Sequence, residues 1–155
     1  MCGICGFVGF EDDVLLGRMC DCLAHRGPDG SGRFVDGSVS LGHRRLAVID
    51  VEGGGQPMCN EDESVWITYN GEVFNYVELR GELERSGHRF HSNSDTEVVV
   101  HAYEEYGADC VSKFNGQFAF AIWDANKEKL FLARDRFGIK PLYYYLNPEV
   151  LLFAS

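Results

Sequence analysis

The order in which helix-like and strand-like segments follow one another constrains the fold of this chain most strongly. Short strand-like segments come first, two helices stand near the middle, and further strands complete the sequence. A doubly wound parallel fold needs strands and helices in regular alternation, which this order lacks. We therefore expect an α+β fold in which antiparallel sheets pack against helices on their outer faces. The 155 residues suffice for one domain with a substantial core.

The expected strands are short apolar runs, some with alternating small or polar neighbours. Two of them flank a turn at residues 125–127 and should form a hairpin. The tight-turn pair Asn70-Gly71 is expected to end the strand that precedes it. The predicted strands are Ile4–Phe10, Val39–Leu41, Arg45–Asp50, Val65–Tyr69, Gln117–Asp124, Lys129–Asp135, Pro141–Leu146 and Val150–Ala154.

Three helices are expected. The first is predicted over Asp12–His25, where apolar residues recur with helical spacing. An Asn or Ser followed three residues later by Glu is the pattern of a capping box, and it predicts helix starts at Asn75–Glu78 and at Ser94–Glu97. Gly107 is expected to end the last of these helices.

The composition argues against several classes of function. The net charge of −10 is unfavourable for binding a phosphate backbone or an anionic membrane surface. Acidic residues at positions 11–13 interrupt any signal-peptide pattern, and no apolar run approaches the roughly 18 residues of a transmembrane span. We therefore expect a cytoplasmic protein that binds neither nucleic acid nor membrane.

The six cysteines are expected to be reduced thiols, because no secretion signal accompanies them. Cys2 and Cys5 form a C-x-x-C pair, but a zinc or redox site needs a second ligand pair at suitable spacing. We therefore expect no metal, and we expect Cys5, Cys20 and Cys22 to be small buried residues. A small redox or metal protein remains the alternative, which metal analysis and thiol titration would test.

Cys2 is the most informative single residue. Removal of Met1 would leave Cys2 with both a thiol and a free α-amino group. An α-amino group titrates near pH 7.7–8.0, so about half of it can act as a base at cellular pH. A terminal amine that activates the side chain of its own residue is a known arrangement in nucleophilic catalysis.

Polar residues at predicted strand and helix ends could complete such a site. The guanidinium of Arg45 could grip a carboxylate, although a solvated surface arginine is the alternative. Asn70 and Gly71 could stabilise an oxyanion, or they could simply form a turn. Asp95 could hold an ammonium group, or complement a helix dipole. Alternating charges in Ala133–Leu142 favour structural ion pairs. Together the first three features suit an amino-acid side-chain amide, with glutamine the obvious candidate.

At this point the chain resembles the glutaminase domain of class II glutamine amidotransferases, which are N-terminal-nucleophile hydrolases. Within that group it is most similar to the amino-terminal domain of glutamine-hydrolysing asparagine synthetases. Each motif alone is weak, but the ordered set is specific and spans essentially the whole chain. The matching stretches are Met1–Gly9 (MCGICGFVG), His25–Gly30 (HRGPDG), Gly42–Asp50 (GHRRLAVID), Gln56–Met58 (QPM), Tyr69–Tyr76 (YNGEVFNY), Ser94–Val98 (SDTEV), Asn115–Asp124 (NGQFAFAIWD) and Ala133–Tyr144 (ARDRFGIKPLYY).

The resemblance implies one domain over residues 1–155, a four-layer αββα sandwich with two antiparallel sheets between helices. It implies Cys2 as the mature nucleophile and Asn70 with Gly71 as the oxyanion hole. The α-carboxylate of glutamine would bind Arg45, and the α-ammonium would bind Glu72 and Asp95. The strand from Arg45 onward would line the pocket with Leu46, Ala47, Val48 and Ile49.

The resemblance also implies partners. L-glutamine would be the substrate, and a synthetase domain, in the same chain or a separate one, would consume the ammonia. The chain has no G-x-x-x-x-G-K-[ST] phosphate loop, so we expect no cofactor here and expect ATP and Mg²⁺ only in that synthetase domain. The chain stops directly after a strand, as expected of a domain cut from a longer protein. A homodimer is also compatible.

The acceptor of the ammonia stays open at this point. Synthesis of asparagine from aspartate is favoured by the resemblance of residues 69–76 and 134–144. Synthesis of glucosamine phosphate or of phosphoribosylamine is the alternative. A binding module that keeps the fold without turnover is a third possibility, which absent catalytic residues would favour.

Overall fold

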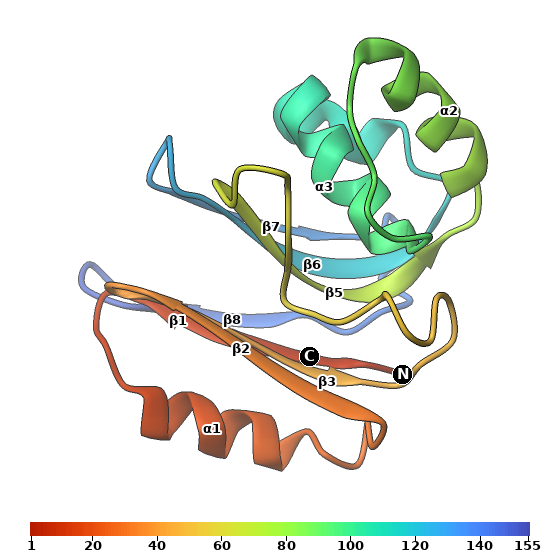
Figure 1. Ribbon diagram of the computed structural model, residues 1–155. Coiled ribbons are helices and arrows are strands. Elements are labelled where there is room, and N and C mark those ends of the chain that lie inside the picture. Colours follow the sequence, from red (N-terminus) through yellow and green to blue (C-terminus); the bar gives the residue numbers. More distant parts are fainter.

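The computed structural model describes residues 1–155, and it has the four layers that the sequence predicts. One helix covers the outer face of the first sheet, the two sheets pack face to face, and two helices cover the second sheet (Figure 1). Every strand pair is antiparallel. The α+β class and the αββα sandwich are therefore confirmed.

The two sheets differ in strand order and origin. The first combines both ends of the chain, and the second is built from its middle. In spatial order the first sheet is β2 (Gly30–Asp36), β3 (Val39–Arg45), β1 (Gly3–Val8), β9 (Leu151–Ala154) and β8 (Tyr143–Leu146). The second is β4 (Met58–Cys59), β5 (Val65–Val73), β6 (Gly116–Asp124) and β7 (Lys129–Arg134).

The helices lie only on the outer faces. The first, α1 (Asp13–Cys22), starts with the Asp12 side chain accepting a hydrogen bond from the backbone of Leu15, and it ends before the predicted limit. The second sheet carries α2 (Tyr76–Ser86) and α3 (Asp95–Tyr106), followed by the short 3₁₀ helix η1 (Gly107–Ser112). None of these helices is long and apolar enough to cross a bilayer.

Two of the strand predictions that are wrong fall beside the cavity described below. The predicted strand Arg45–Asp50 does not form, because Arg45 is the last residue of β3 and an irregular segment follows it. The strand starting at Val65 does not end at Asn70-Gly71 but continues to Val73. Gly71 lies opposite Phe118 of β6, where a Cβ atom would come within 2.8 Å of its side chain, so glycine allows the ladder to continue.

Both predicted N-cap positions are confirmed, but neither capping box forms. Ser94 caps α3 through its hydroxyl, whereas Asn75 makes no cap bond. The Asn75 side chain instead donates to Lys113 O and accepts from Asn115 N, which ties the start of α2 to the segment before β6. Glu97 turns away from Ser94 and accepts hydrogen bonds from the loop before the helix. Gly107 ends α3 as predicted.

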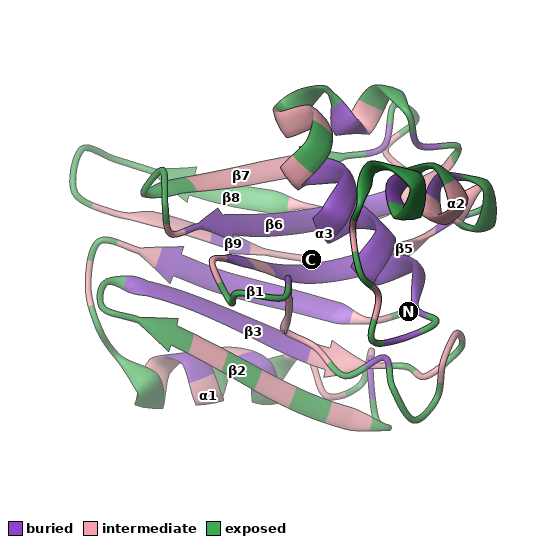
Figure 2. Ribbon diagram, turned by 45° about the horizontal axis from the view of Figure 1, so that its top comes forward, coloured by how far each residue is buried: buried purple, intermediate pink, exposed green.

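The largest core lies between the second sheet and its two helices (Figure 2). It includes the fully buried Phe120 and Leu83, and burial of such a side chain stabilises the fold by about 1.5–3 kcal/mol. Cys5 and Cys20 are buried between α1 and the first sheet, as predicted, with their sulfur atoms 3.8 Å apart. Cys22 is exposed, which corrects the expectation for that residue.

A histidine lies buried between the two sheets. The Thr68 hydroxyl donates to Gly42 O at 3.0 Å, so it can only accept from Nδ1–H of His43, 3.2 Å away. The opposite ring nitrogen has no partner. Burial, with a smaller effect of Arg45, lowers the pKa of His43 to about 3, so the ring is neutral in the folded protein.

The buried neutral ring predicts a pH dependence of stability. Unfolded His43 takes up a proton below its ordinary pKa of 6.5, whereas folded His43 stays neutral down to about pH 3. Its contribution is therefore complete above pH 6.5 and declines as the pH falls toward 3. In urea titrations from pH 7.5 to 4.5, the free energy of unfolding of wild type should fall by up to about 1.4 kcal/mol per pH unit more than that of His43→Asn. The asparagine retains an N–H donor for Thr68. Parallel curves would contradict this assignment.

Candidate active site

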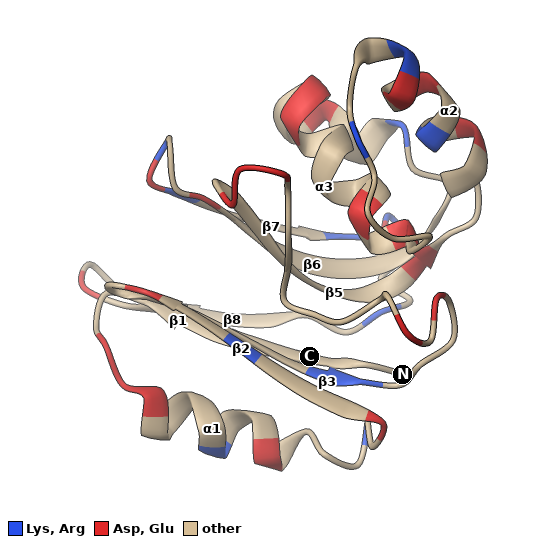
Figure 3. Ribbon diagram, in the orientation of Figure 1, with Lys and Arg blue, Asp and Glu red and all other residues tan.

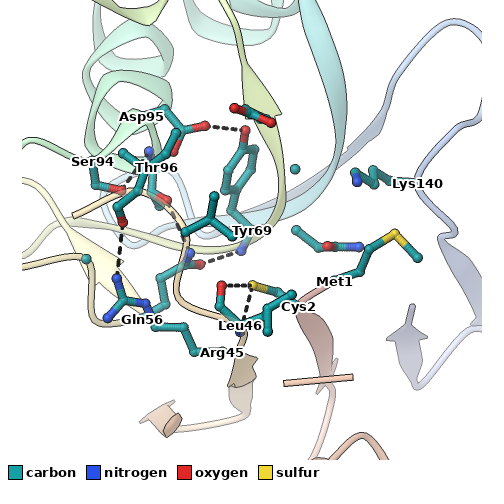
Figure 4. Close-up of a pocket in the computed structure, with 16 residues that line it drawn as sticks. Met1, Cys2, Arg45, Leu46, Gln56, Tyr69, Ser94, Asp95, Thr96 and Lys140 are labelled. Carbon is teal, nitrogen blue, oxygen red and sulfur yellow. Dashed lines mark hydrogen bonds between the residues drawn. The ribbon is translucent and has the colours of Figure 1, made fainter. Parts of the chain in front are cut away.

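A cavity of about 160 Å³ opens beside the start of β1, where the ends of the two sheets meet (Figure 4). It contains every residue that the sequence analysis assigns to the site except Ala47. The lining comprises Met1, Cys2, Arg45, Leu46, Val48, Ile49, Gly54, Gln56, Tyr69, Asn70, Gly71, Glu72, Ser94, Asp95, Thr96 and Lys140.

Cys2 lies at one wall of this cavity, immediately before β1. Its carbonyl oxygen accepts a hydrogen bond from Arg26 Nε at 3.1 Å. Its sulfur is 3.3 Å from Leu46 N, which donates to it, and 3.6 Å from Leu46 O. Cys2 is thus held by two segments distant in sequence, one bound to its carbonyl oxygen and the other to its sulfur. The backbone N–H of Leu46 also offers a hydrogen bond to a thiolate at this position.

Arg45 shapes the segment that follows β3. Its guanidinium donates to Val51 O at 2.7 Å, to Asp50 O at 2.5 Å and to Ile49 O at 3.2 Å. These bonds fold the backbone around the arginine, which explains why no strand forms here. A Cβ atom at Gly54 would collide with the guanidinium. Three of the five guanidinium donors are engaged, so the others remain for a ligand.

Ala47 does not line the cavity, although its neighbours Leu46, Val48 and Ile49 do. Its N–H donates to Asp29 Oδ2 at 2.9 Å, which fixes the segment to the turn before β2. The prediction of a pocket-lining strand treated these residues as one continuous wall. In the irregular segment, each residue has its own orientation.

Asn70 presents an unusual polar group to the cavity. The residue is 1% exposed, and its side-chain nitrogen is buried with no hydrogen-bond partner. A buried donor without a partner costs roughly 1–3 kcal/mol, so it calls for an explanation. Gly71 follows on the same strand and also lines the cavity. A ligand oxygen entering here would satisfy the amide.

Two carboxylates face the cavity from the second sheet and its helix layer. Asp95 opens α3, and its Oδ2 accepts from the Tyr69 hydroxyl at 2.8 Å and from Val73 N at 3.0 Å. Burial is the main cause that raises the pKa of Asp95, and the nearby Glu72 adds to it. Glu72 is half-buried on β5. The pair can bind a positive charge, which would relieve their mutual repulsion.

Sequence reasoning did not assign Gln56, Thr96 or Lys140 to the site. The Gln56 side chain accepts from Tyr69 N at 2.7 Å and donates to Thr96 Oγ1 at 3.1 Å, so it joins β5 to the start of α3. Figure 4 shows Gln56 and Lys140 on opposite sides of the cavity. The stretches Gln56–Met58 and Ala133–Tyr144, which contain Gln56 and Lys140, matched the family without indicating a chemical role for either residue.

Lys140 reaches the cavity through a loop that one carboxylate organises. Asp135 accepts hydrogen bonds from four backbone N–H groups, and these bonds outweigh its burial and lower its pKa. The neighbouring Arg134 donates to Gly138 O and Lys140 O. The charged side chains thus bind backbone, and the predicted ion pairs do not form. The N–H donors to Asp135 are those of Phe118, Phe137, Ile139 and Lys140.

Comparison with known proteins gives one consistent family. The whole chain, residues 1–155, matches the family described as a glutamine amidotransferase domain. Asparagine synthetase [glutamine-hydrolyzing] 1 of Bacillus subtilis is 48% identical over 98% of the chain, and a putative asparagine synthetase [glutamine-hydrolyzing] 2 of Methanocaldococcus jannaschii is 39% identical over all of it. The chain spans only 26% and 34% of the lengths of these relatives.

A solved structure supports the fold. Glutamine phosphoribosylpyrophosphate amidotransferase of Bacillus subtilis, described in complex with ADP and GMP, superposes with a TM-score of 0.79. The superposition covers 99% of this chain and 41% of the other, at 25% sequence identity.

The role of Arg45 in shaping its own segment predicts a measurable effect. Arg45→Lys keeps the charge but cannot bridge three carbonyls, and each lost hydrogen bond costs about 0.5–1.5 kcal/mol. Amide exchange of Gly54, whose N–H donates to Asp50 O, should accelerate on the order of tenfold. Arg33→Lys, at an exposed ion pair, serves as the control and should leave it unchanged. Equal exchange in both variants would contradict this role.

Proposed function

The chain belongs to the glutamine amidotransferase domain family, and on this premise we propose that it hydrolyses the side-chain amide of glutamine to glutamate and ammonia. One observation carries the proposal: Cys2 and Asn70, whose buried side-chain nitrogen has no hydrogen-bond partner, line the same cavity. A nucleophile and a donor for the developing oxyanion are the two groups that acyl transfer requires.

The charges around the cavity suit the two ends of an α-amino acid. Arg45 has donors left for the α-carboxylate, while Glu72 and Asp95 can share the α-ammonium. Oδ2 of Asp95 already accepts hydrogen bonds from Tyr69 and Val73, so Asp95 would contact the ammonium through its other oxygen. These assignments orient the side-chain amide of glutamine toward Cys2.

The reaction begins after removal of Met1, which frees the α-amine of Cys2. The amine accepts the thiol proton, and the sulfur forms a bond to Cδ of the glutamine side chain. Asn70 and Gly71 donate hydrogen bonds to the resulting oxyanion. The protonated amine returns the proton to the leaving nitrogen, the C–N bond breaks, and ammonia departs. Water then attacks the γ-glutamyl thioester, which releases glutamate and restores the thiol.

The ammonia should serve a second reaction. The similar proteins are named as glutamine-hydrolysing asparagine synthetases, and this chain covers about a quarter to a third of their length. We infer that a synthetase domain, in the same or another chain, consumes the ammonia, with asparagine formation from aspartate the favoured outcome. The residues of this domain need no cofactor for the hydrolysis. ATP and Mg²⁺ would act in the synthetase domain.

Covalent labelling tests the nucleophile. Incubation with a diazoketone analogue of glutamine should add one label per chain at Cys2, after intact mass has confirmed that the chain begins there. Cys2→Ala should take no label, whereas Cys22→Ala, which removes an exposed cysteine outside the cavity, should be labelled like wild type. Labelling of Cys2→Ala, or none on a confirmed Cys2 terminus, would count against the proposal.

Substitution of Asn70 tests the oxyanion hole. Loss of one such donor lowers kcat by about 10²–10³ in other enzymes, so Asn70→Ala should reduce glutamate release to that extent with little change in KM. Because it also removes a buried unpartnered donor, its unfolding free energy should stay within about 1 kcal/mol of wild type. Asn126→Ala, at an exposed turn, is the control. A kcat within a factor of about three would remove Asn70 from this role.

A further inference from the structure

A cluster of histidines and glutamates lies on the side of α3 away from the catalytic cavity. Its members come from three segments: the turn at residues 60–64, the connection at residues 87–94, and α3 itself. One ligand atom of each of Glu61, His88 and His101 lies within 4.8 Å of the others. Glu104 adds a carboxylate to the same space. Figure 3 shows acidic residues gathered on α2, α3 and the loops beside them.

The same ring nitrogen of both histidines points into this space. His101 Nδ1 is 2.8 Å from Glu104 Oε2 and 3.7 Å from Glu61 Oε2. His88 Nδ1 is 3.8 Å from Glu104 Oε2. Ligand atoms around a tetrahedral ion with bonds of about 2.0–2.2 Å lie roughly 3.3–3.6 Å apart. Small side-chain rotations would therefore bring these atoms to coordination distance.

Each histidine also has a carboxylate behind it. His101 Nε2 is 3.7 Å from Glu97 Oε1, and His88 Nε2 is 3.3 Å from Glu105 Oε2. Metal-binding histidines typically donate their second N–H to a carboxylate, which fixes the tautomer and orients the ring. Glu97 is itself held by hydrogen bonds from the backbone of His91 and Ser92. His88 thus has an outer partner at hydrogen-bond distance, and the nearest carboxylate to His101 Nε2, that of Glu97, lies just beyond that distance.

The charge of the cluster also demands a cation. Four carboxylates surround two imidazoles, and the only ion pairs that these carboxylates make are with the histidines. His101 is completely buried, and its Nε2 has no partner at hydrogen-bond distance. The surroundings therefore favour a positive charge at this position.

We propose that this cluster binds one zinc ion through Nδ1 of His88, Nδ1 of His101 and the carboxylates of Glu61 and Glu104. Two imidazoles with carboxylates suit zinc, whereas Mg²⁺ and Ca²⁺ prefer oxygen ligands alone. The ion takes the place of the proton between His101 and Glu104. Glu61 also lines an open groove of about 520 Å³ beside the cluster, which gives the ion a path from solvent.

Zinc bound here would connect α3 to two other segments of the chain. Glu61 lies before β5, His88 lies after α2, and the remaining ligands lie on α3, whose first residues Asp95 and Thr96 line the catalytic cavity. The ion would thus stabilise the helix that carries one wall of the cavity. Because it binds only the folded arrangement, it should raise the melting temperature with increasing zinc concentration.

The experiment uses the full chain, without a histidine tag, in a Cys2→Ala background that removes the reactive thiol as a competing ligand. After chelation and dialysis, zinc is added and the bound metal is measured by atomic emission, with thermal melting in parallel. One equivalent should bind. Glu61→Gln and His88→Gln should each weaken binding at least as much as the 10–100-fold typical for an outer partner, and Glu105→Gln by about 10-fold.

His25→Gln removes an exposed histidine outside the cluster and should bind zinc like the parent chain. Circular dichroism of each variant separates lost binding from lost folding. Cobalt(II) in place of zinc should give a spectrum without the thiolate charge-transfer band. No bound equivalent, equal binding by folded Glu61→Gln and His88→Gln, or a thiolate band would each overturn the proposal.

Discussion

The antiparallel ladder between β1 and β3 is the contact on which the catalytic cavity depends. In its register Gly3 lies opposite Arg44, so Cys2, which precedes β1, and Arg45, the last residue of β3, lie at the same end of the sheet. At this end of the sheet the backbone N–H of Leu46 donates a hydrogen bond to the sulfur of Cys2. Because ladder hydrogen bonds fix the register by whole residues, a slip of one position would turn these side chains to the other face.

Single carboxylates that accept backbone N–H groups hold the loops around this end of the molecule. Asp29 binds Ala47 N, Asp50 binds the N–H groups of Gly53 and Asn93, and Asp135 binds four more. A charged acceptor makes stronger hydrogen bonds than a neutral one, so one side chain can order several irregular residues. The loops thereby present cavity residues with defined positions, although they contain no regular secondary structure.

This use of side chains also decides what could be predicted from sequence. Antiparallel sheets with helices outside them follow from the order of apolar runs and helix starts, since these reflect burial directly, whereas the four-layer arrangement came from the family resemblance. Cys2, Asn70 and Asp95 could be proposed because each lies in a short motif with a chemical role, although Asn70 lies within β5 and not at its end. Lys140 could not, because its place depends on Asp135 binding distant backbone groups. For the same reason the segment after Arg45 resembled a strand: its residues are apolar, but the guanidinium folds their backbone into a loop.

The helix α3 shows why polar groups are placed as they are. Its residues from Asp95 to Tyr103 are all buried, so each polar side chain among them needs a partner inside the protein. Asp95 finds partners on β5 and faces the cavity, whereas Glu97 and His101 face the histidine–glutamate cluster. The spacing of the cysteines gave no indication of a metal. The proposed zinc ligands could not be found from sequence spacing either, because they come from three separate segments. Buried charges on two sides of one helix favour a positive group on each side, and the proposed substrate ammonium and the proposed zinc ion would meet those two requirements separately.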